Sequence, residues 1–163
     1  MNVIEKKLSL CISYMKQQWL EIKYKGCKFG SKVYIKPGFR VLIEKEASLE
    51  IGDRTFFNYG CSITALSMIK IGRNCLFGED VKIYDHNHVF KFMPIPIADQ
   101  GFSRGGGVIV GNNVWIGSNV ILLKGCEIGD NSVIAAGAVV DKMIPAYSIY
   151  RRDGSIERIV LSK

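Results

Sequence analysis

The two histidines of this chain, His86 and His88, lie two positions apart in the stretch YDHNHVF at 84–90. Such closely spaced imidazoles can bind zinc, act as general bases, or simply form loop hydrogen bonds. Catalytic zinc commonly takes three protein ligands, and with no third histidine only Asp85 could substitute. General-base chemistry is favoured, because imidazole titrates near neutral pH and the Asp85 carboxylate can orient a ring.

Covalent catalysis and metal binding have weaker support. No Cys or Ser stands beside the histidines in a nucleophile motif, which favours direct transfer chemistry. The five cysteines form no CxxC pair and no zinc spacing, and their odd number indicates reduced thiols. We therefore expect no metal site.

A six-residue repeat must position these histidines. Residues 110–145 divide into the blocks VGNNVW, IGSNVI, LLKGCE, IGDNSV, IAAGAV and VDKMIP, each of which begins with an aliphatic residue. The same frame starts at Ile51 and Ile71, and a weaker one starts at Phe29. A period of six fits neither a helix nor an alternating strand, but it fits short strands wound as a triangular coil.

The repeat predicts where each block position lies. The first residue should point into the core, and the fifth should be a small corner residue, which makes Cys61, Cys75 and Cys126 apolar fillers. Glycine at the bend should supply a positive φ. We predict an all-β fold, a parallel β-helix of about five coils at 29–146, preceded by an N-terminal helix and lead-in at 1–28 and followed by a tail at 147–163.

The frame stops after Ile83 and resumes at Val108–Val110. The residues between them, 84–107, include both histidines, two prolines and the run RGGG. Long loops that leave a regular scaffold usually carry function. We expect an arm at one corner of the third coil, with the histidines at its root.

The N-terminal segment has a different pattern and most of the charge. Residues 2–20 place apolar residues three and four apart, which predicts an amphipathic helix. Residues 1–40 hold nine Lys/Arg and two acids, so they carry 9 − 2 = +7, the formal net charge of the whole chain. Such a helix can cap the open end of the coil. It can also make peripheral contact with an anionic membrane, and both interpretations stay open.

Length and composition fit one globular domain. The chain has 163 residues, of which 48% are hydrophobic, and no apolar run approaches the roughly 18 residues of a membrane span. The N-terminal apolar positions are interrupted by lysines, unlike a signal peptide. We expect a cytoplasmic protein without a nucleic-acid partner.

The stretch IVGNNVWIGSNVILLKGCEIGDNSVIAAGAVVDKMIP, together with the DHNH loop, resembles the left-handed β-helix acyltransferases. The resemblance covers about 29–146 and is strongest to the maltose, galactoside and polysaccharide O-acetyltransferases. It implies a left-handed coil and a homotrimer whose active sites lie between neighbouring subunits. It also implies acetyl-CoA as the acyl donor, attacked directly by an acceptor hydroxyl without a metal.

The resemblance also implies roles for individual residues. His86 matches the general base, with Asp85 as its orienting group and His88 as the second candidate. Asn58 and Trp115 match acceptor-binding positions. Matches to the coenzyme site are Trp115, Ser118, Ala136 and Lys142, and Arg158 in the atypical tail is expected to replace a basic contact with the 3′-phosphate.

One departure concerns the acceptor. The galactoside enzymes carry an acidic acceptor-binding residue where this chain has Ala65 and Leu66. We therefore expect an O-acetyltransferase acting on a sugar or a surface-polysaccharide precursor rather than on a simple galactoside. Three alternatives remain: a xenobiotic or amino-sugar acetyltransferase, a non-catalytic solenoid scaffold, and a zinc hydratase.

Overall fold

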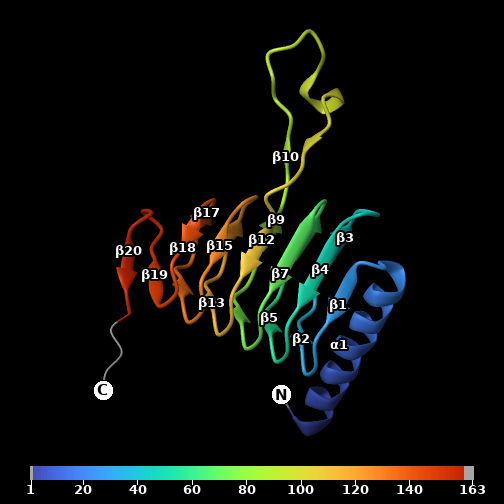
Figure 1. Ribbon diagram of the computed structural model, residues 1–163. Helices are drawn as coiled ribbons and strands as arrows, with labels where there is room; N and C mark the ends of the chain where they lie inside the picture. The colour runs from blue at the N-terminus through green and yellow to red at the C-terminus, as the bar shows by residue number, and fades with distance from the viewer. Residues whose placement is uncertain (1, 160–163) are drawn as a thin grey trace.

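The computed structural model describes residues 2–159 and shows a prism built from three parallel sheets (Figure 1). The first sheet contains β1 (Cys27–Phe29), β4 (Ser48–Ile51), β7 (Met68–Ile71), β12 (Val108–Val110), β15 (Glu127–Ile128) and β18 (Met143–Ile144). The second contains β2 (Tyr34–Ile35), β5 (Phe56–Phe57), β8 (Leu76–Phe77), β13 (Trp115–Ile116), β16 (Val133–Ile134), β19 (Ser148–Tyr150) and the antiparallel β20 (Ile156–Arg158). The third contains β3 (Arg40–Ile43), β6 (Ser62–Ala65), β9 (Lys82–Tyr84), β14 (Ile121–Leu122) and β17 (Val139–Val140).

Successive strands visit the three sheets in turn, so the predicted parallel β-helix is confirmed. The first sheet has six strands, so the coil makes six turns rather than about five. The extra turn arises at the C-terminal end, where β18 lies within the last predicted block, 140–145, and β19 follows that block.

The core follows the repeat frame. Ile51, Phe77, Leu122 and the other first-position residues of the strong frames are buried, and Phe57 and Phe77 stack with ring centroids 4.4 Å apart. The predicted corner fillers Cys61, Cys75 and Cys126 are also buried. Each turn thus buries apolar side chains on those of its neighbours, which makes this continuous core the main source of stability.

The glycine at the second position of a block does not have a positive φ. A Cβ on Gly111 would lie 2.3 Å from Oδ1 of Asp130 in the next turn, so the glycine is required by close stacking of the coils. The positive φ falls two residues later, at the fourth position, where Gly60, Gly125 and Gly137 supply it as predicted and asparagine takes their place in other blocks, as at Asn113. Asparagine tolerates this left-handed conformation better than most residues.

The N-terminal helix, α1 (Val3–Lys23), lies across the first turn of the coil (Figure 1). It begins with a capping box, in which Asn2 and Glu5 exchange side-chain-to-backbone hydrogen bonds. Within residues 2–159 no helix is long and apolar enough to cross a membrane.

Residues 85–107 leave the corner between the third and first sheets as an arm that projects away from the prism (Figure 1). Its two limbs pair through β10 (Asn87–His88) and β11 (Phe102–Ser103), and a short 3₁₀ helix, η1 (Ile97–Asp99), lies near its tip. The expected arm with both histidines at its root is present.

Candidate active site

The root of the arm is built on a buried carboxylate. Asp85 has no exposed surface, and its two oxygens accept the backbone N–H groups of Leu66 (2.8 Å) and Ser67 (2.7 Å). These donors belong to the turn one coil below, so Asp85 connects the point where the arm departs to the preceding coil. Charge-assisted bonds of this kind are stronger than neutral ones and fix the backbone locally.

His86 stands directly above this carboxylate. Its Nδ1 lies 3.4 Å from Oδ1 of Asp85, and only 14% of its side chain is exposed. The rings of Tyr84 and Phe102 flank it edge-on, with centroids 6.1 Å and 5.4 Å away. Because Nδ1 faces the carboxylate, Nε2 is the nitrogen available to exchange a proton with a ligand.

His88 lies farther out on the same limb. It is exposed, pairs in register with Phe102 across the arm, and has its ring centroid 4.6 Å from that of Phe102. It also lines a shallow pocket of about 250 Å³ on the arm. Both imidazoles therefore contact the Phe102 ring, which the sequence did not single out because its place depends on how the two limbs pair.

The returning limb is held to the prism by a lysine that sequence reasoning also missed. Nζ of Lys124 donates hydrogen bonds to the backbone oxygens of Ser103 and Arg104 and to Oγ of Ser103. Arg104 forms an ion pair with Glu44. These contacts fix the arm root at both ends, which is what a positioned catalytic group requires.

Three of the predicted coenzyme-binding residues lie on a different side of the prism. Trp115 is on the outer surface of the second sheet with 53% of its area exposed, so it does not cover the core. Ser118 and Ala136 follow β13 and β16 at the corner between the second and third sheets, where Gly117 packs against Ala136. His86 lies at the next corner, so a single chain does not bring these groups together.

The remaining predicted residues are dispersed. Asn58 is half-buried at the corner after β5, and its Oδ1 accepts the Tyr59 N–H. Lys142 is exposed at the corner from which the arm leaves, two turns farther along, with Nζ 5.5 Å from the Tyr150 ring centroid. Arg158 in β20 donates to the carbonyl oxygen of Ala146 (3.0 Å), at the third corner.

The buried thiols are poor nucleophiles. Burial raises the pKa of Cys61 to about 11 and that of Cys126 to about 12, so both are protonated at neutral pH. Within the described residues 2–159, no three His, Cys, Asp or Glu side chains gather in a group that could hold a metal ion. The chemistry available at the arm root is therefore that of a positioned imidazole.

Comparison with known proteins agrees with this geometry. Residues 107–142 match the family model of the bacterial transferase hexapeptide (six repeats). The chain is 32% identical over 124 residues to the galactoside O-acetyltransferase of Escherichia coli, covering 76% of this chain and 59% of that enzyme. The corresponding enzyme of Lactococcus lactis is 29% identical over 147 residues, 88% of this chain and 67% of that enzyme. The predicted resemblance to the hexapeptide-repeat acyltransferases is confirmed.

Solved structures show the same resemblance. A hexapeptide-repeat acetyltransferase of Vibrio cholerae complexed with acetyl-CoA is 27% identical with a TM-score of 0.73, over 89% of this chain and 74% of that one. A galactoside acetyltransferase in complex with coenzyme A is 25% identical with a TM-score of 0.76, over 89% and 70%. The chain spans only about half the length of several curated relatives.

Proposed function

We propose that this hexapeptide-repeat protein transfers an acetyl group from acetyl-CoA to a hydroxyl of a sugar or a surface-polysaccharide precursor. The observation that carries the proposal is the arm root, where His86 is held against a buried, doubly hydrogen-bonded carboxylate. The comparisons support the donor, since matched structures contain acetyl-CoA or coenzyme A. No metal takes part in the proposed reaction.

The arm root offers two imidazoles for the general base, and we place His86 first because Asp85 orients its ring. Nε2 takes the proton of the acceptor hydroxyl while the hydroxyl oxygen attacks the thioester carbonyl carbon. The tetrahedral intermediate then expels the coenzyme A sulfur, which takes the proton back from the imidazolium. Backbone N–H groups along the coil edge would stabilise the oxyanion. His88 is the alternative base.

The site is completed by a neighbouring copy in a homotrimer. Trp115, Ser118 and Ala136 lie one corner away from His86, so the second sheet of one chain has to face the arm root of another. The outer surface of that sheet supports this arrangement, because its register carries an apolar column: Tyr34, Phe56, Leu76, Trp115, Val133 and Ile149. The equivalent positions of the first sheet begin with Lys28, Glu50 and Lys70.

The coenzyme in this arrangement runs along the groove between two prisms. Ser118 and Ala136 line its pantetheine arm, and Lys142 and Arg158 provide positive charge for its phosphates. Lys142 is exposed and free to reach a phosphate. Arg158 would have to exchange its bond to the Ala146 carbonyl for one to the ligand, so its contribution is the smaller.

The acceptor contacts come from Asn58, Trp115 and the arm. Ala65 and Leu66, which stand where the galactoside enzymes have an acid, are buried, and the Leu66 N–H is already bound by Asp85. An acceptor hydroxyl therefore meets no carboxylate on this turn. This supports a saccharide other than a simple galactoside.

The test is acetyl-CoA turnover with a panel of free and activated saccharides, measured as acetylated product. Product that gives acetohydroxamate with hydroxylamine is an ester and supports O-transfer, since an amide resists this treatment. Turnover of amino sugars alone, giving amides, would favour the amino-sugar or xenobiotic reaction. Failure to bind acetyl-CoA in calorimetry would favour the scaffold, and stoichiometric zinc in the purified protein would favour a hydratase.

A further inference from the structure

The helix α1 contacts the prism with its polar side. Ser13 is buried, and its Oγ accepts the backbone N–H of Ile35 (2.9 Å). Gln17 is also buried and donates to the carbonyl oxygen of Val33 (3.0 Å), while Lys16 donates to that of Phe39. Among the large apolar residues of α1, only Leu20 is buried. The helix therefore provides hydrogen-bond partners for backbone groups at the open edge of the first turn.

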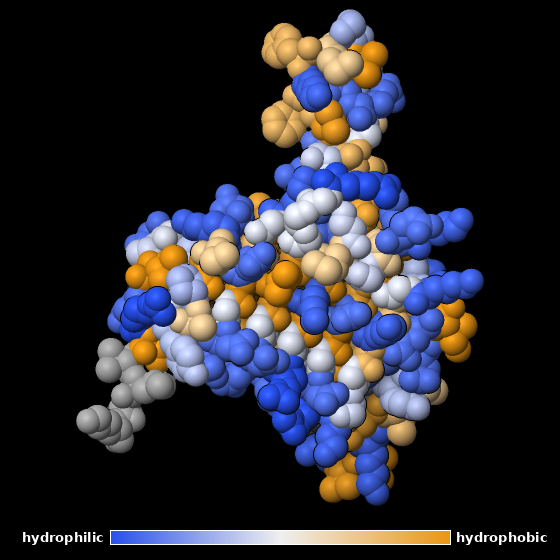
Figure 2. Space-filling view, viewed as in Figure 1, coloured by the Kyte–Doolittle hydropathy of each residue, from blue (hydrophilic) through white to orange (hydrophobic). Residues whose placement is uncertain are grey.

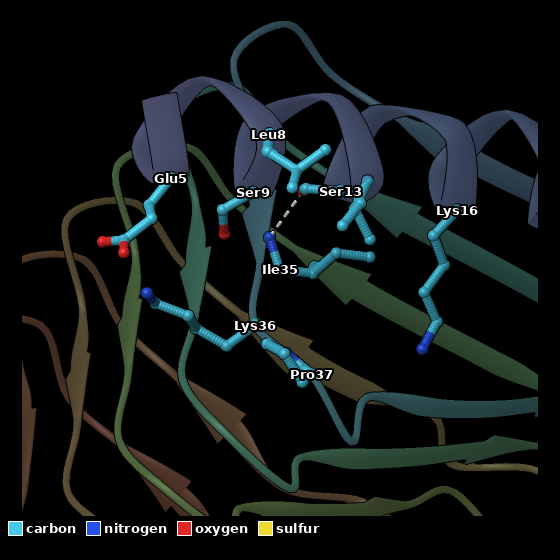
Figure 3. Close-up of a pocket in the computed structure, with 9 residues that line it drawn as sticks. Glu5, Leu8, Ser9, Ser13, Lys16, Ile35, Lys36 and Pro37 are labelled. Carbon is cyan, nitrogen blue, oxygen red and sulfur yellow. Dashed lines mark hydrogen bonds between the residues drawn. The ribbon is translucent and has the colours of Figure 1, made fainter. Parts of the chain in front are cut away.

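The contact is also incompletely packed. A pocket of about 330 Å³ remains between α1 and the first turn, lined mainly by apolar atoms of Leu8, Ile12, Ile35 and Pro37 (Figure 3). Figure 3 shows the Ser13 bond to Ile35 at the back of this pocket. The apolar side of the amphipathic helix is thus not used for folding, contrary to what a capping role alone would need.

That apolar side faces solvent as a continuous stripe. Its residues recur three and four apart, so they share one side of the helix. Trp19 is 54% exposed, Met15 60% and Ile22 83%, and the full stripe is Ile4, Leu8, Cys11, Met15, Trp19 and Ile22. Leu8 is at the margin of the stripe, where it also lines the pocket. Figure 2 shows orange side chains along the outer edge of α1 among blue ones. An apolar stripe of this length normally meets a partner or a membrane.

The charge around the stripe distinguishes a protein partner from a membrane. Lys7 and Lys23 lie on α1, and four further basic residues follow on the first turn at its edges: Lys28, Lys32, Lys36 and Arg40. Residues 1–40 contain two acids, and both accept backbone N–H groups: Glu5 in the capping box and Glu21 from Phe29 (2.7 Å). Two copies meeting through this end would place like charges opposite each other. An anionic lipid surface has the complementary charge.

We infer that α1 docks the protein on anionic membranes, lying in the headgroup region with its stripe against the acyl chains. Tryptophan suits this depth, because its ring is apolar and its N–H is polar, and Lys23 places Nζ 4.8 Å from the Trp19 ring centroid. Each basic residue near such a surface raises the affinity by about fivefold. The inference stands apart from the acetyl-transfer proposal, since none of the residues assigned to transfer belongs to α1.

The experiment is flotation of the full chain with phosphatidylcholine vesicles, with and without about 30 mol % phosphatidylserine. The protein is expected to float with the anionic vesicles, at least tenfold more than with neutral ones, and to be released between about 0.05 and 0.5 M NaCl. Equal binding to both vesicles, or no binding to either, would overturn the inference.

A matched pair of substitutions tests the stripe itself. Met15→Ser is expected to lower vesicle binding about tenfold. Met143→Ser removes a methionine of similar exposure, 66%, at the opposite end of the prism and should leave binding unchanged. Circular dichroism reports whether each variant folds. The contrary result is a wild type that does not float and forms a larger assembly, which Met15→Ser dissociates. In that case a second copy covers the stripe, and the membrane inference is wrong.

Discussion

The carboxylate of Asp85 lies 3.4 Å from Nδ1 of His86, although its main partners are two backbone N–H groups of the turn below. One buried side chain therefore contacts the His86 ring and fixes the place where the arm leaves the coil. The two roles make different demands, because orientation affects turnover whereas the backbone bonds affect folding.

Replacement of Asp85 separates these roles. In Asp85→Asn, the amide NH₂ faces one of the two N–H donors, so a buried donor loses its acceptor and we expect a loss of about 1–3 kcal/mol in the free energy of unfolding. Turnover per folded protein should also fall. Urea unfolding and initial rates measure the two effects, and His86→Asn is the control, which should lower turnover and leave the unfolding midpoint nearly unchanged. An unaltered midpoint in Asp85→Asn would contradict the assigned contacts.

The two histidines give a second prediction. A positioned general base contributes about 10²–10⁴-fold to the rate, so His86→Asn should lower kcat by that factor. His88→Asn, which changes a more exposed ring on the same limb, should lower it by less than tenfold. Steady-state kinetics with saturating acetyl-CoA measure both. The reverse order of losses would assign the base to His88 and reduce His86 to a positioning residue.

The thiols provide a third prediction. Cys11 is exposed, whereas burial raises the pKa of Cys27 and Cys126 to about 12 and that of Cys61 to about 11. At pH 8 the native protein should therefore show one rapidly reacting thiol towards a disulfide reagent, and five after denaturation. Cys11→Ser should remove the rapid phase. If a rapidly reacting thiol remains in Cys11→Ser, a coil corner must open and expose one of the buried cysteines.

The stacked glycines give a fourth prediction. In Gly129→Ala the new Cβ would lie 2.3 Å from the backbone N of Ala146, so neighbouring coils must separate, and the free energy of unfolding should fall by at least about 2 kcal/mol. Gly101→Ala on the arm is the control, because its Cβ meets nothing within 4 Å and only its positive φ costs about 1 kcal/mol. Equal losses would show that backbone conformation, not close stacking of the coils, explains the glycine at this position.

Much of the fold was predictable because each hexapeptide contributes one first-position core residue. The burial of a residue such as Ile51 or Leu122 therefore follows from its position in the repeat alone. The asparagines were missed as the positive-φ residues because the periodicity does not distinguish a close approach, as at Gly111, from a left-handed bend, as at Asn113. The direction of α1 was also not predictable. An amphipathic pattern shows that one side is apolar but not which side meets the coil.

At the candidate site, the sequence indicated His86 and Asp85 because they interrupt the repeat. It could not indicate Phe102 or Lys124, whose contacts depend on how the limbs of the arm pair and return. The separation of Trp115 from His86 follows from the three-sheet winding, and it means that one chain holds only part of the proposed site.

This separation leads to the most direct test of the account. Chains carrying His86→Ala and His88→Ala together are co-expressed with differently tagged chains carrying Trp115→Ala, and mixed assemblies are purified through both tags. If the site combines the arm of one chain with the second sheet of another, each mixed trimer contains one site of three with both halves intact. Acetyl transfer should then return to roughly a third of the wild-type rate. Mixed assemblies that form but stay as inactive as either variant alone would contradict the shared site.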